Sequence, residues 1–168
     1  VLSVLNIRTL PDPILRQKAR RVTTIDDKLQ QLIDDMIDTM RDAQGVGLAA
    51  NQVGSLQRVV VIEIPEDEQV YVLINPEITR RQGERVVEEG CLSIPGYRGE
   101  LSRSLKVRVR ALDRNGGMIK IKAEGLLAQA LEHETDHING TLYIDHLQGA
   151  DQLWRIVHHH GDSEAEAS

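Results

Sequence analysis

Two histidines and a glutamate lie close together in the C-terminal part of the chain, in the order His133, Glu134, His137. The surrounding segment, 126–140, reads as one helix, in which residues four apart stand on the same face. His133 and His137 can therefore bind one metal ion from adjacent turns. Glu134 lies beside them and can move a proton to or from a metal-bound water. The spacing predicts a metal-dependent hydrolase.

The apolar side of this helix includes these polar residues. Both histidines share a stripe with Leu126 and Ala130, and Glu134 lies on the neighbouring stripe among leucines and an isoleucine. A solvated helix would place its charges opposite the leucines. Because buried histidine and glutamate cost free energy unless they are paired or bind a metal, the pattern favours a metal site over a surface helix.

A catalytic metal site needs a third protein ligand and an open position for water. One group of metalloproteases would have a third histidine at Tyr143, so that group is disfavoured. Asp145 and His146 are available, but no spacing argument supports them. The single cysteine, Cys91, is a buried structural thiol, a reactive thiol or a metal ligand. Its neighbour Gly90 lets the backbone approach a site closely, and a thiolate binds divalent iron, zinc, cobalt or nickel.

The chain as a whole has the size and composition of one compact domain. Its 168 residues are 40% hydrophobic and 27% charged, and the absence of phenylalanine leaves a core of valine, isoleucine and leucine. No apolar run approaches the roughly 20 residues that span a membrane. The net charge of −6 argues against a nucleic-acid-binding protein, because binding to nucleic acid needs a basic face. We expect a single catalytic domain over 1–150 and a short, partly disordered tail over 151–168.

Hydrophobic spacing divides the chain into two long helices and several strands. A helix is predicted with Thr24 as its N-cap and an end near Gly45. Strands are expected at 57–64, 70–74, 85–89, 105–111 and 119–122. The third strand is expected to continue the sheet of the first two, and the basic residues of the last two to form a solvated face. Strands clustered between two helices predict an α+β fold, with antiparallel sheets packed around a central motif-bearing helix.

Three segments together resemble the signature motifs of the peptide deformylases. They are 45–52 (Gly-Val-Gly-Leu-Ala-Ala-Asn-Gln), 89–93 (Glu-Gly-Cys-Leu-Ser) and 133–137 (His-Glu-Thr-Asp-His), and they occur in the family order. The resemblance runs from the arm at Asp12 to Leu147. It implies an enzyme that removes the formyl group from the N-terminal formyl-methionine of newly made polypeptides.

The resemblance also implies a role for each matching residue. The metal would typically be Fe²⁺, with Zn²⁺, Ni²⁺ or Co²⁺ as substitutes, and its ligands would be Cys91, His133 and His137. Glu134 would act as the general base and then the general acid, while metal-bound hydroxide attacks the formyl carbon. Gln52 and the backbone N–H of Leu92 would stabilise the resulting oxyanion.

The same segments would hold the substrate. By similarity and by helix face, the slot for the methionine side chain is lined by Val46, Val87, Leu126, Ala130 and His133. Gly47 and Gly90 would offer backbone hydrogen bonds to an extended peptide. Arg98 is either a contact for that peptide or a solvated loop arginine. Gln129 lies near this slot, at a position where the family often has an apolar residue. A polar residue there bears on which substrate side chain the slot prefers.

Two other functions stay open at this point. A zincin-type metallo-aminopeptidase would cleave unformylated peptides, although Tyr143 replaces the histidine it needs. A catalytically silent peptide-binding or metal-binding relative would have no need of Glu134 and Gln52.

The expected partners are formyl-methionyl nascent peptides and, transiently, the ribosome, with no membrane and no direct nucleic-acid readout. The short acidic tail argues against ribosome docking through a basic C-terminal helix. The expected location is the bacterial cytoplasm, and an organellar one stays open because the chain begins at Val1.

Overall fold

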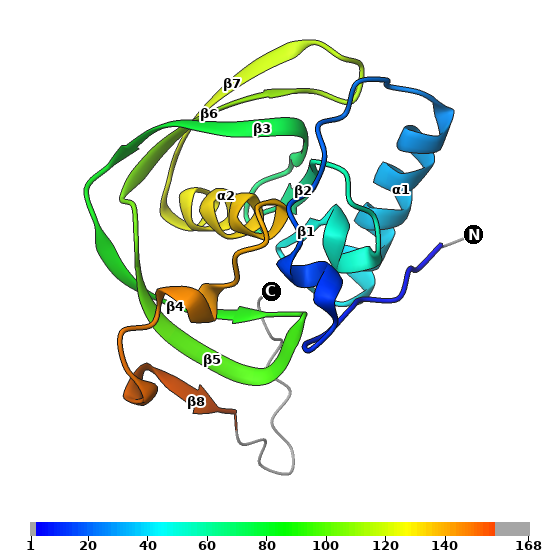
Figure 1. Cartoon of the computed structure of the whole chain (residues 1–168). Coiled ribbons are helices and arrows are strands. Elements are labelled where there is room, and N and C mark those ends of the chain that lie inside the picture. Colours follow the sequence, from blue (N-terminus) through cyan, green and yellow to red (C-terminus); the bar gives the residue numbers. More distant parts are fainter. Residues whose placement is uncertain (1–2, 157–168) are drawn as a thin grey trace.

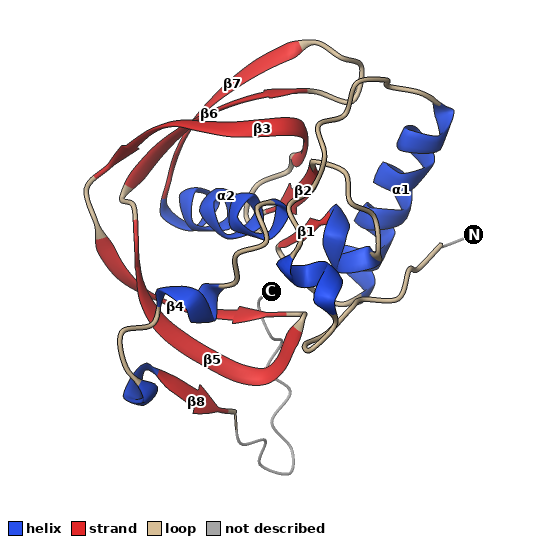
Figure 2. Ribbon diagram, viewed as in Figure 1, coloured by secondary structure: helices blue, strands red, loops and turns tan. Residues whose placement is uncertain are grey.

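Two antiparallel sheets surround one helix in the computed structural model, which describes residues 3–156 (Figure 1). Helix α2 (Gly125–Ile138) carries the histidine motif and runs between the sheets, while α1 (Asp27–Asp42) lies to one side of them (Figure 2). The predicted α+β fold with a central motif-bearing helix is confirmed. Neither of these helices is long and apolar enough to cross a membrane.

The larger sheet has five strands in the order β1-β2-β3-β6-β7. These strands are β1 (Gly47–Ala49), β2 (Val59–Glu63), β3 (Val70–Gln82), β6 (Lys106–Leu112) and β7 (Met118–Glu124). β6 and β7 pair as an antiparallel hairpin, with a tight turn between them. Gly116 in that turn has a φ of 88°, a left-handed conformation that glycine adopts without strain.

A smaller sheet contains β4 (Arg85–Cys91), β5 (Ile94–Arg103) and β8 (Leu153–Arg155), in the order β4-β5-β8. The prediction that residues 85–89 continue the larger sheet is therefore wrong. Periodicity identified the strand, but a period of two carries no information about which strand is its neighbour.

The two sheets meet where a long two-stranded ribbon bends around α2 (Figure 1). On one side of the bend Gln82 of β3 pairs with Lys106 of β6, and on the other Arg85 of β4 pairs with Arg103 of β5. Gly83 lies at the bend with a φ of 70°. A side chain at this position would be strained by its backbone conformation, so glycine is the residue that lets the ribbon turn here.

Strand β2 separates two hydrophobic clusters. Val60 and Ile62 belong to the cluster that α2 shares with the larger sheet, and Val59 and Val61 belong to the cluster formed with α1. Because helices cover both faces, the strand is a continuous apolar run instead of an alternating one. A third cluster lies between β4, β5 and a short helix, η3 (Tyr143–His146).

The N-cap of helix α1 lies two residues after the predicted one. Its N-cap is Asp26, whose carboxylate accepts a hydrogen bond from the backbone N–H of Leu29 at 2.9 Å, so the prediction of Thr24 is wrong. The remaining short helices are η1 (Pro13–Arg16), η2 (Ala50–Val53) and η4 (Ala150–Gln152). In the segment expected to form the tail, residues 153–155 form β8, and residues 157–168 lie outside the described residues.

Candidate metal centre and active site

One thiol and two imidazoles lie together near the centre of the molecule. The Sγ atom of Cys91 lies 3.2 Å from Nε2 of His137, which lies 3.1 Å from Nε2 of His133. All three side chains are buried, and their ligand atoms lie within 4.8 Å of one another. The structure thus brings together the three residues predicted as metal ligands.

This donor set fits a divalent metal ion. A thiolate with two imidazoles suits Fe²⁺, Zn²⁺, Co²⁺ or Ni²⁺, and three buried donors that face one another are unfavourable without a cation between them. The other sequence candidates lie elsewhere, since Asp145 forms an ion pair with Arg16 and His146 lies 2.8 Å from Asp136. Within residues 3–156, Cys91 and the two helix histidines are the group able to hold a metal.

Strand alternation along β4 brings the cysteine to the helix. The register of β4 with β5 shifts between Glu89 and Cys91, and Leu92 and Ser93 form the turn into β5. The extra residues at this shift lie on β5, between Gly99 and Ile94, so β4 keeps the alternation that puts residues two apart on the same face. Glu89 and Cys91 can therefore both be buried against α2.

The side-chain amide of Gln52 has a defined orientation beside the cysteine. Its Oε1 atom accepts a hydrogen bond from the backbone N–H of Ala49 at 3.0 Å, which directs Nε2 into the site. Nε2 lies 3.1 Å from Oγ of Ser93 and 3.7 Å from Sγ of Cys91. A neutral amide donor placed here can hydrogen-bond an oxygen that gains negative charge during a reaction.

Glu134 lies in dry surroundings next to the two histidines. It is 1% exposed, and its Oε1 atom has no hydrogen-bond partner among the described residues. Burial raises the pKa of Glu134 to about 7, against the lowering effect of His133. A carboxyl group with a pKa near neutrality can both take and return a proton. Gly47 makes room for it, because a Cβ atom at Gly47 would lie 2.5 Å from Oε2 of Glu134.

A second carboxylate, Glu89, orients one of the imidazoles. Its Oε1 atom lies 2.6 Å from Nδ1 of His133, and Arg103 donates two hydrogen bonds to the same group at 2.7 and 2.8 Å. Burial raises the pKa of Glu89, but the hydrogen bonds from Arg103 and His133 outweigh it and lower the pKa to about 2. An ionised carboxylate can accept hydrogen bonds but cannot donate them. Nδ1 of His133 must therefore carry the hydrogen, which leaves Nε2 free to bind a metal.

The electrostatics of the two imidazoles differ in a way that suits a cation site. Burial lowers the pKa of His133, but Glu134, Cys91 and Glu89 together raise it well above its usual value. Burial, and then the positive charge of His133, lowers the pKa of His137 well below its usual value. The site thus favours positive charge beside a neutral imidazole, which is the form that ligates metals.

Arg103 and Asp136 belong to this network although neither was given a role from the sequence. The Arg103 side chain is 3% exposed and also donates a hydrogen bond to Asp136 at 2.8 Å. Arg103 on β5 is thereby joined to Glu89 on β4 and to Asp136 on α2. A signal was available in the alternation of β5, which places Arg103 on the same buried face as Leu101. A charge at an inward position of a strand indicates a buried partner.

The residues predicted to bind substrate lie on or beside strands β1, β4 and β5 and on α2. Val46 lies just before β1, and its carbonyl oxygen accepts a hydrogen bond from the backbone N–H of Glu63. Gly47 is the first residue of β1. Val87 and Gly90 lie on β4, the edge strand of the smaller sheet.

The α2 and β5 residues of the predicted substrate site differ in exposure. Ala130 is 3% exposed and packs in the core shared with the larger sheet. Leu126, in the first turn of α2, is 41% exposed. Arg98 on β5 is half-buried and lies 4.0 Å from Glu88. Their contact with substrate stays a prediction. Gln129 donates to the backbone carbonyl of Glu88 at 3.1 Å, which directs its amide to β4.

We predict that the Arg103 ion network is a major contributor to stability. Arg103→Met leaves the buried carboxylate of Glu89 and the partly buried carboxylate of Asp136 without their arginine partner, and it should lower the free energy of unfolding by about 3–5 kcal/mol. The matched control is Arg110→Met, which removes an exposed pair with Glu77 at 3.0 Å and should cost less than about 1 kcal/mol. Urea titration of both variants measures the difference, and equal losses would contradict the assignment.

Comparison with known proteins agrees with the site. Residues 4–152 match the family model described as polypeptide deformylase. A peptide deformylase of Dehalococcoides mccartyi strain CBDB1 is 54% identical over 155 residues, which cover 92% of this chain and 93% of that protein. One from Halothermothrix orenii is 50% identical over 144 residues, covering 86% of this chain and 94% of that protein.

Solved structures show the same fold. The crystal structure of a peptide deformylase from Legionella pneumophila superposes with a TM-score of 0.86 at 49% identity and covers 89% of each chain. That of the Synechococcus elongatus enzyme in complex with actinonin gives a TM-score of 0.85 at 42% identity, covering 89% of this chain and 82% of that one. With a family match over nearly its whole length, this chain belongs to the peptide deformylase family.

Proposed function

We propose that this deformylase removes the formyl group from the N-terminal formyl-methionine of newly made polypeptides at the centre formed by Cys91, His133 and His137. The observation that supports this most directly is the convergence of these three buried ligand atoms, within 4.8 Å of one another. Glu134 and the directed amide of Gln52 adjoin them, which supplies a proton carrier and a hydrogen-bond donor on the same site.

We propose Fe²⁺ as the metal, with Zn²⁺, Ni²⁺ or Co²⁺ as substitutes, because a thiolate and two imidazoles accept all four ions. When bound, the metal supplies Lewis acidity, which polarises a carbonyl oxygen and lowers the pKa of water toward neutrality. Glu89 keeps His133 in the tautomer that leaves Nε2 free for this role.

Glu134 moves the proton that the reaction requires. It takes a proton from the attacking water, whose oxygen forms a bond to the formyl carbon. It then gives that proton to the peptide nitrogen as the carbon–nitrogen bond breaks, so the products are formate and a free amino terminus. The dry surroundings of Glu134 support both steps, since burial brings its pKa to about 7.

Gln52 and Leu92 stabilise the negative charge that develops on the formyl oxygen. Gln52 donates from Nε2, whose direction is set by the bond between its Oε1 and the N–H of Ala49 at 3.0 Å. Leu92 follows Cys91 in the turn between β4 and β5, which supports this role for its backbone N–H. Loss of one such donor typically lowers turnover by about 10²–10³.

The topology supports binding of the substrate as an added strand. β1 is one edge strand of the larger sheet and β4 is one edge strand of the smaller sheet, and both carry site residues. An extended peptide between them would hydrogen-bond to the backbone of Gly47 and Gly90. The methionine side chain would then lie among Val46, Val87, Leu126, Ala130 and His133, with Arg98 beside the following residues.

Nascent formyl-methionyl chains are the proposed partners, reached during a transient contact with the ribosome. The relatives named above are bacterial proteins, which supports a bacterial cytoplasmic location.

The proposed reaction is tested by measuring formate released from a formyl-methionyl peptide by the iron-loaded protein under anaerobic conditions. Glu134→Gln keeps the shape of the side chain but not its basicity, and it should lower kcat/KM by about 10²–10⁴. The unformylated peptide is the matched substrate and should stay intact. Formate release no faster than that of the variant, or cleavage of the unformylated peptide, would contradict the proposal.

Gly47→Ala should remove activity without removing the metal. Its Cβ atom would lie 2.5 Å from Oε2 of Glu134 and displace the carboxylate, while the three ligands are untouched. Displacement by about 1 Å can cost about 10² in rate. Gly117→Ala is the control, because its Cβ atom also meets a carboxylate, at 3.0 Å from Oδ2 of Asp113, but on the β6–β7 hairpin. Full turnover in Gly47→Ala, measured together with metal content, would refute this placement of Glu134.

A further inference from the structure

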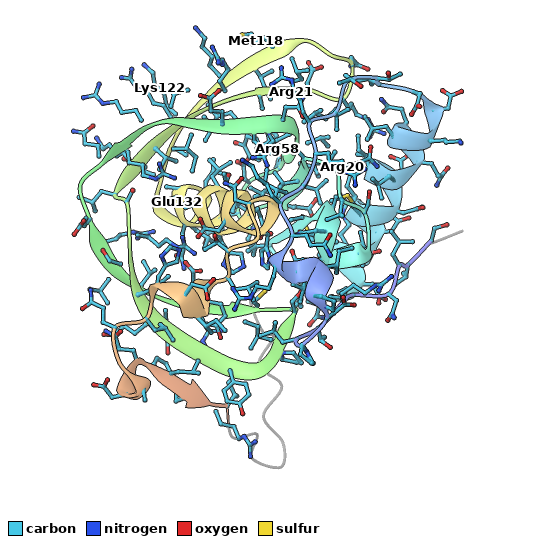
Figure 3. The ribbon with its side chains drawn as sticks, in the orientation of Figure 1. Arg20, Arg21, Arg58, Met118, Lys122 and Glu132 are labelled. Carbon is cyan, nitrogen blue, oxygen red and sulfur yellow. The ribbon has the colours of Figure 1, made fainter. Side chains whose placement is uncertain are left out.

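The outer face of the larger sheet is strongly basic. Along β6 and β7, exposed residues alternate with residues such as Val107, Val109 and Ala123 that pack toward α2. The exposed positions, with one from β3, form what we call the basic face: Arg80, Lys106, Arg108, Arg110, Lys120 and Lys122. In Figure 3 the side chains of Lys122 and Met118 lie on the outer side of this sheet, away from α2. These cations are concentrated in a chain whose net charge is −6.

Strand register places like charges opposite one another on this face. Arg108 is the cross-strand partner of both Arg80 and Lys122, and Arg110 is the partner of Lys120. Side chains paired in this way lie about 5 Å apart at Cβ, and like charges there destabilise a sheet. Glu124, opposite Lys106, and Glu77 are the acidic residues at this face.

Few of these cations are neutralised by the protein itself. In the part of the chain that the structure describes, Arg110 forms an ion pair with Glu77 at 3.0 Å, and the other five residues of the basic face form none. Four of the six, Arg80, Lys106, Arg108 and Lys122, also line a surface hollow of about 340 Å³. The hollow and the unpaired charge together indicate a site for a partner that is itself negatively charged.

Protection of the sheet edge against pairing with other chains does not account for all the cations of the basic face. β7 is an edge strand, and lysines on an edge deter pairing with other chains, which would explain Lys120 and Lys122. Arg108 and Arg110, however, lie on β6, which has β3 on one side and β7 on the other. Guanidinium groups bind phosphate in a fixed two-pronged geometry, so arginines in the middle of the sheet favour a phosphate ligand.

We propose that the basic face binds the phosphate backbone of double-stranded RNA. Alternate residues of a strand are about 6.6–6.8 Å apart and neighbouring strands about 4.8 Å apart, so the cations form a lattice suited to a row of phosphates, not to one small anion. Tyr71 is the one aromatic residue on β3, and β6 and β7 have none, so the face lacks the aromatic platform on which single-strand binders stack unpaired bases. Binding of this kind reads charge and shape, not base sequence.

The proposed function supplies the setting for this contact, and the inference rests on it to that extent. A nascent chain carrying the formyl group is attached to the ribosome, whose surface is largely RNA. The basic face is built on the outside of the larger sheet and the metal centre on its inner side with α2, so RNA on this face would not compete with the substrate peptide.

The test is the binding of an end-labelled RNA duplex to the metal-loaded protein, followed by fluorescence anisotropy at several salt concentrations. Lys106→Gln/Lys122→Gln removes two exposed charges of the basic face. It should weaken binding at low salt about tenfold or more and reduce the slope of log K against log salt by about 2. The matched control is Lys18→Gln/Lys28→Gln, which makes the same change at exposed residues away from this face and should bind within about twofold of the parent.

Formate release from a soluble formyl-methionyl peptide, measured on the same samples, separates this inference from the proposed function. Unchanged release with weakened RNA binding in the Lys106→Gln/Lys122→Gln variant supports the basic face as the RNA site. Equal weakening in both double variants, salt-independent binding, no RNA binding by the parent protein, or tighter binding to anionic lipid vesicles than to RNA would overturn it. Absent formate release by the parent protein would count against the proposed function alone.

Discussion

The buried ion network of Glu89 and Arg103 is the interaction on which the site depends. It joins β4, β5 and, through Asp136, helix α2, and it does so with two side chains that are each 3% exposed. Ions taken out of water gain stability only where geometry and hydrogen bonding are complete, as in the forked contact at 2.7 and 2.8 Å. A carboxylate held ionised in this way determines which nitrogen of His133 carries hydrogen. One ion pair therefore links the packing of the smaller sheet against α2 to the chemistry of the metal centre.

Two carboxylates close to the metal ligands are given opposite properties by their surroundings. Arginine and histidine donors lower the pKa of Glu89 to about 2, so it serves as a constant negative charge. Dry packing raises the pKa of Glu134 to about 7, so it can exchange a proton near neutrality. These different environments distinguish Glu89, an acid with a structural role, from Glu134, an acid that can take part in the reaction. The bend at Gly83 makes both environments, because it wraps the smaller sheet around the same helix that the larger sheet packs against.

Local chemistry was predictable from the sequence, and strand partnership was not. The i, i+4 spacing of His133 and His137 on an apolar face required no knowledge of neighbours, and the structure places their Nε2 atoms 3.1 Å apart. Alternation identified β4 as a strand but could not show that it leaves the larger sheet at Gly83. Arg103 was missed because residues 94–103 were not predicted as a strand, so its inward position was not recognised. The basic residues of β6 and β7 were expected to be a solvated face, and only the register showed that like charges oppose one another there.

The central claim is that Cys91 completes a metal site with the two helix histidines. X-ray absorption at the zinc edge, on protein loaded with Zn²⁺ under reducing conditions, tests it most directly because sulfur and nitrogen scatter at different distances. The account predicts one sulfur at about 2.3 Å and two imidazole nitrogens at about 2.0–2.1 Å, with a light-atom ligand in the fourth position. A first shell of nitrogen and oxygen alone, without sulfur, would contradict it.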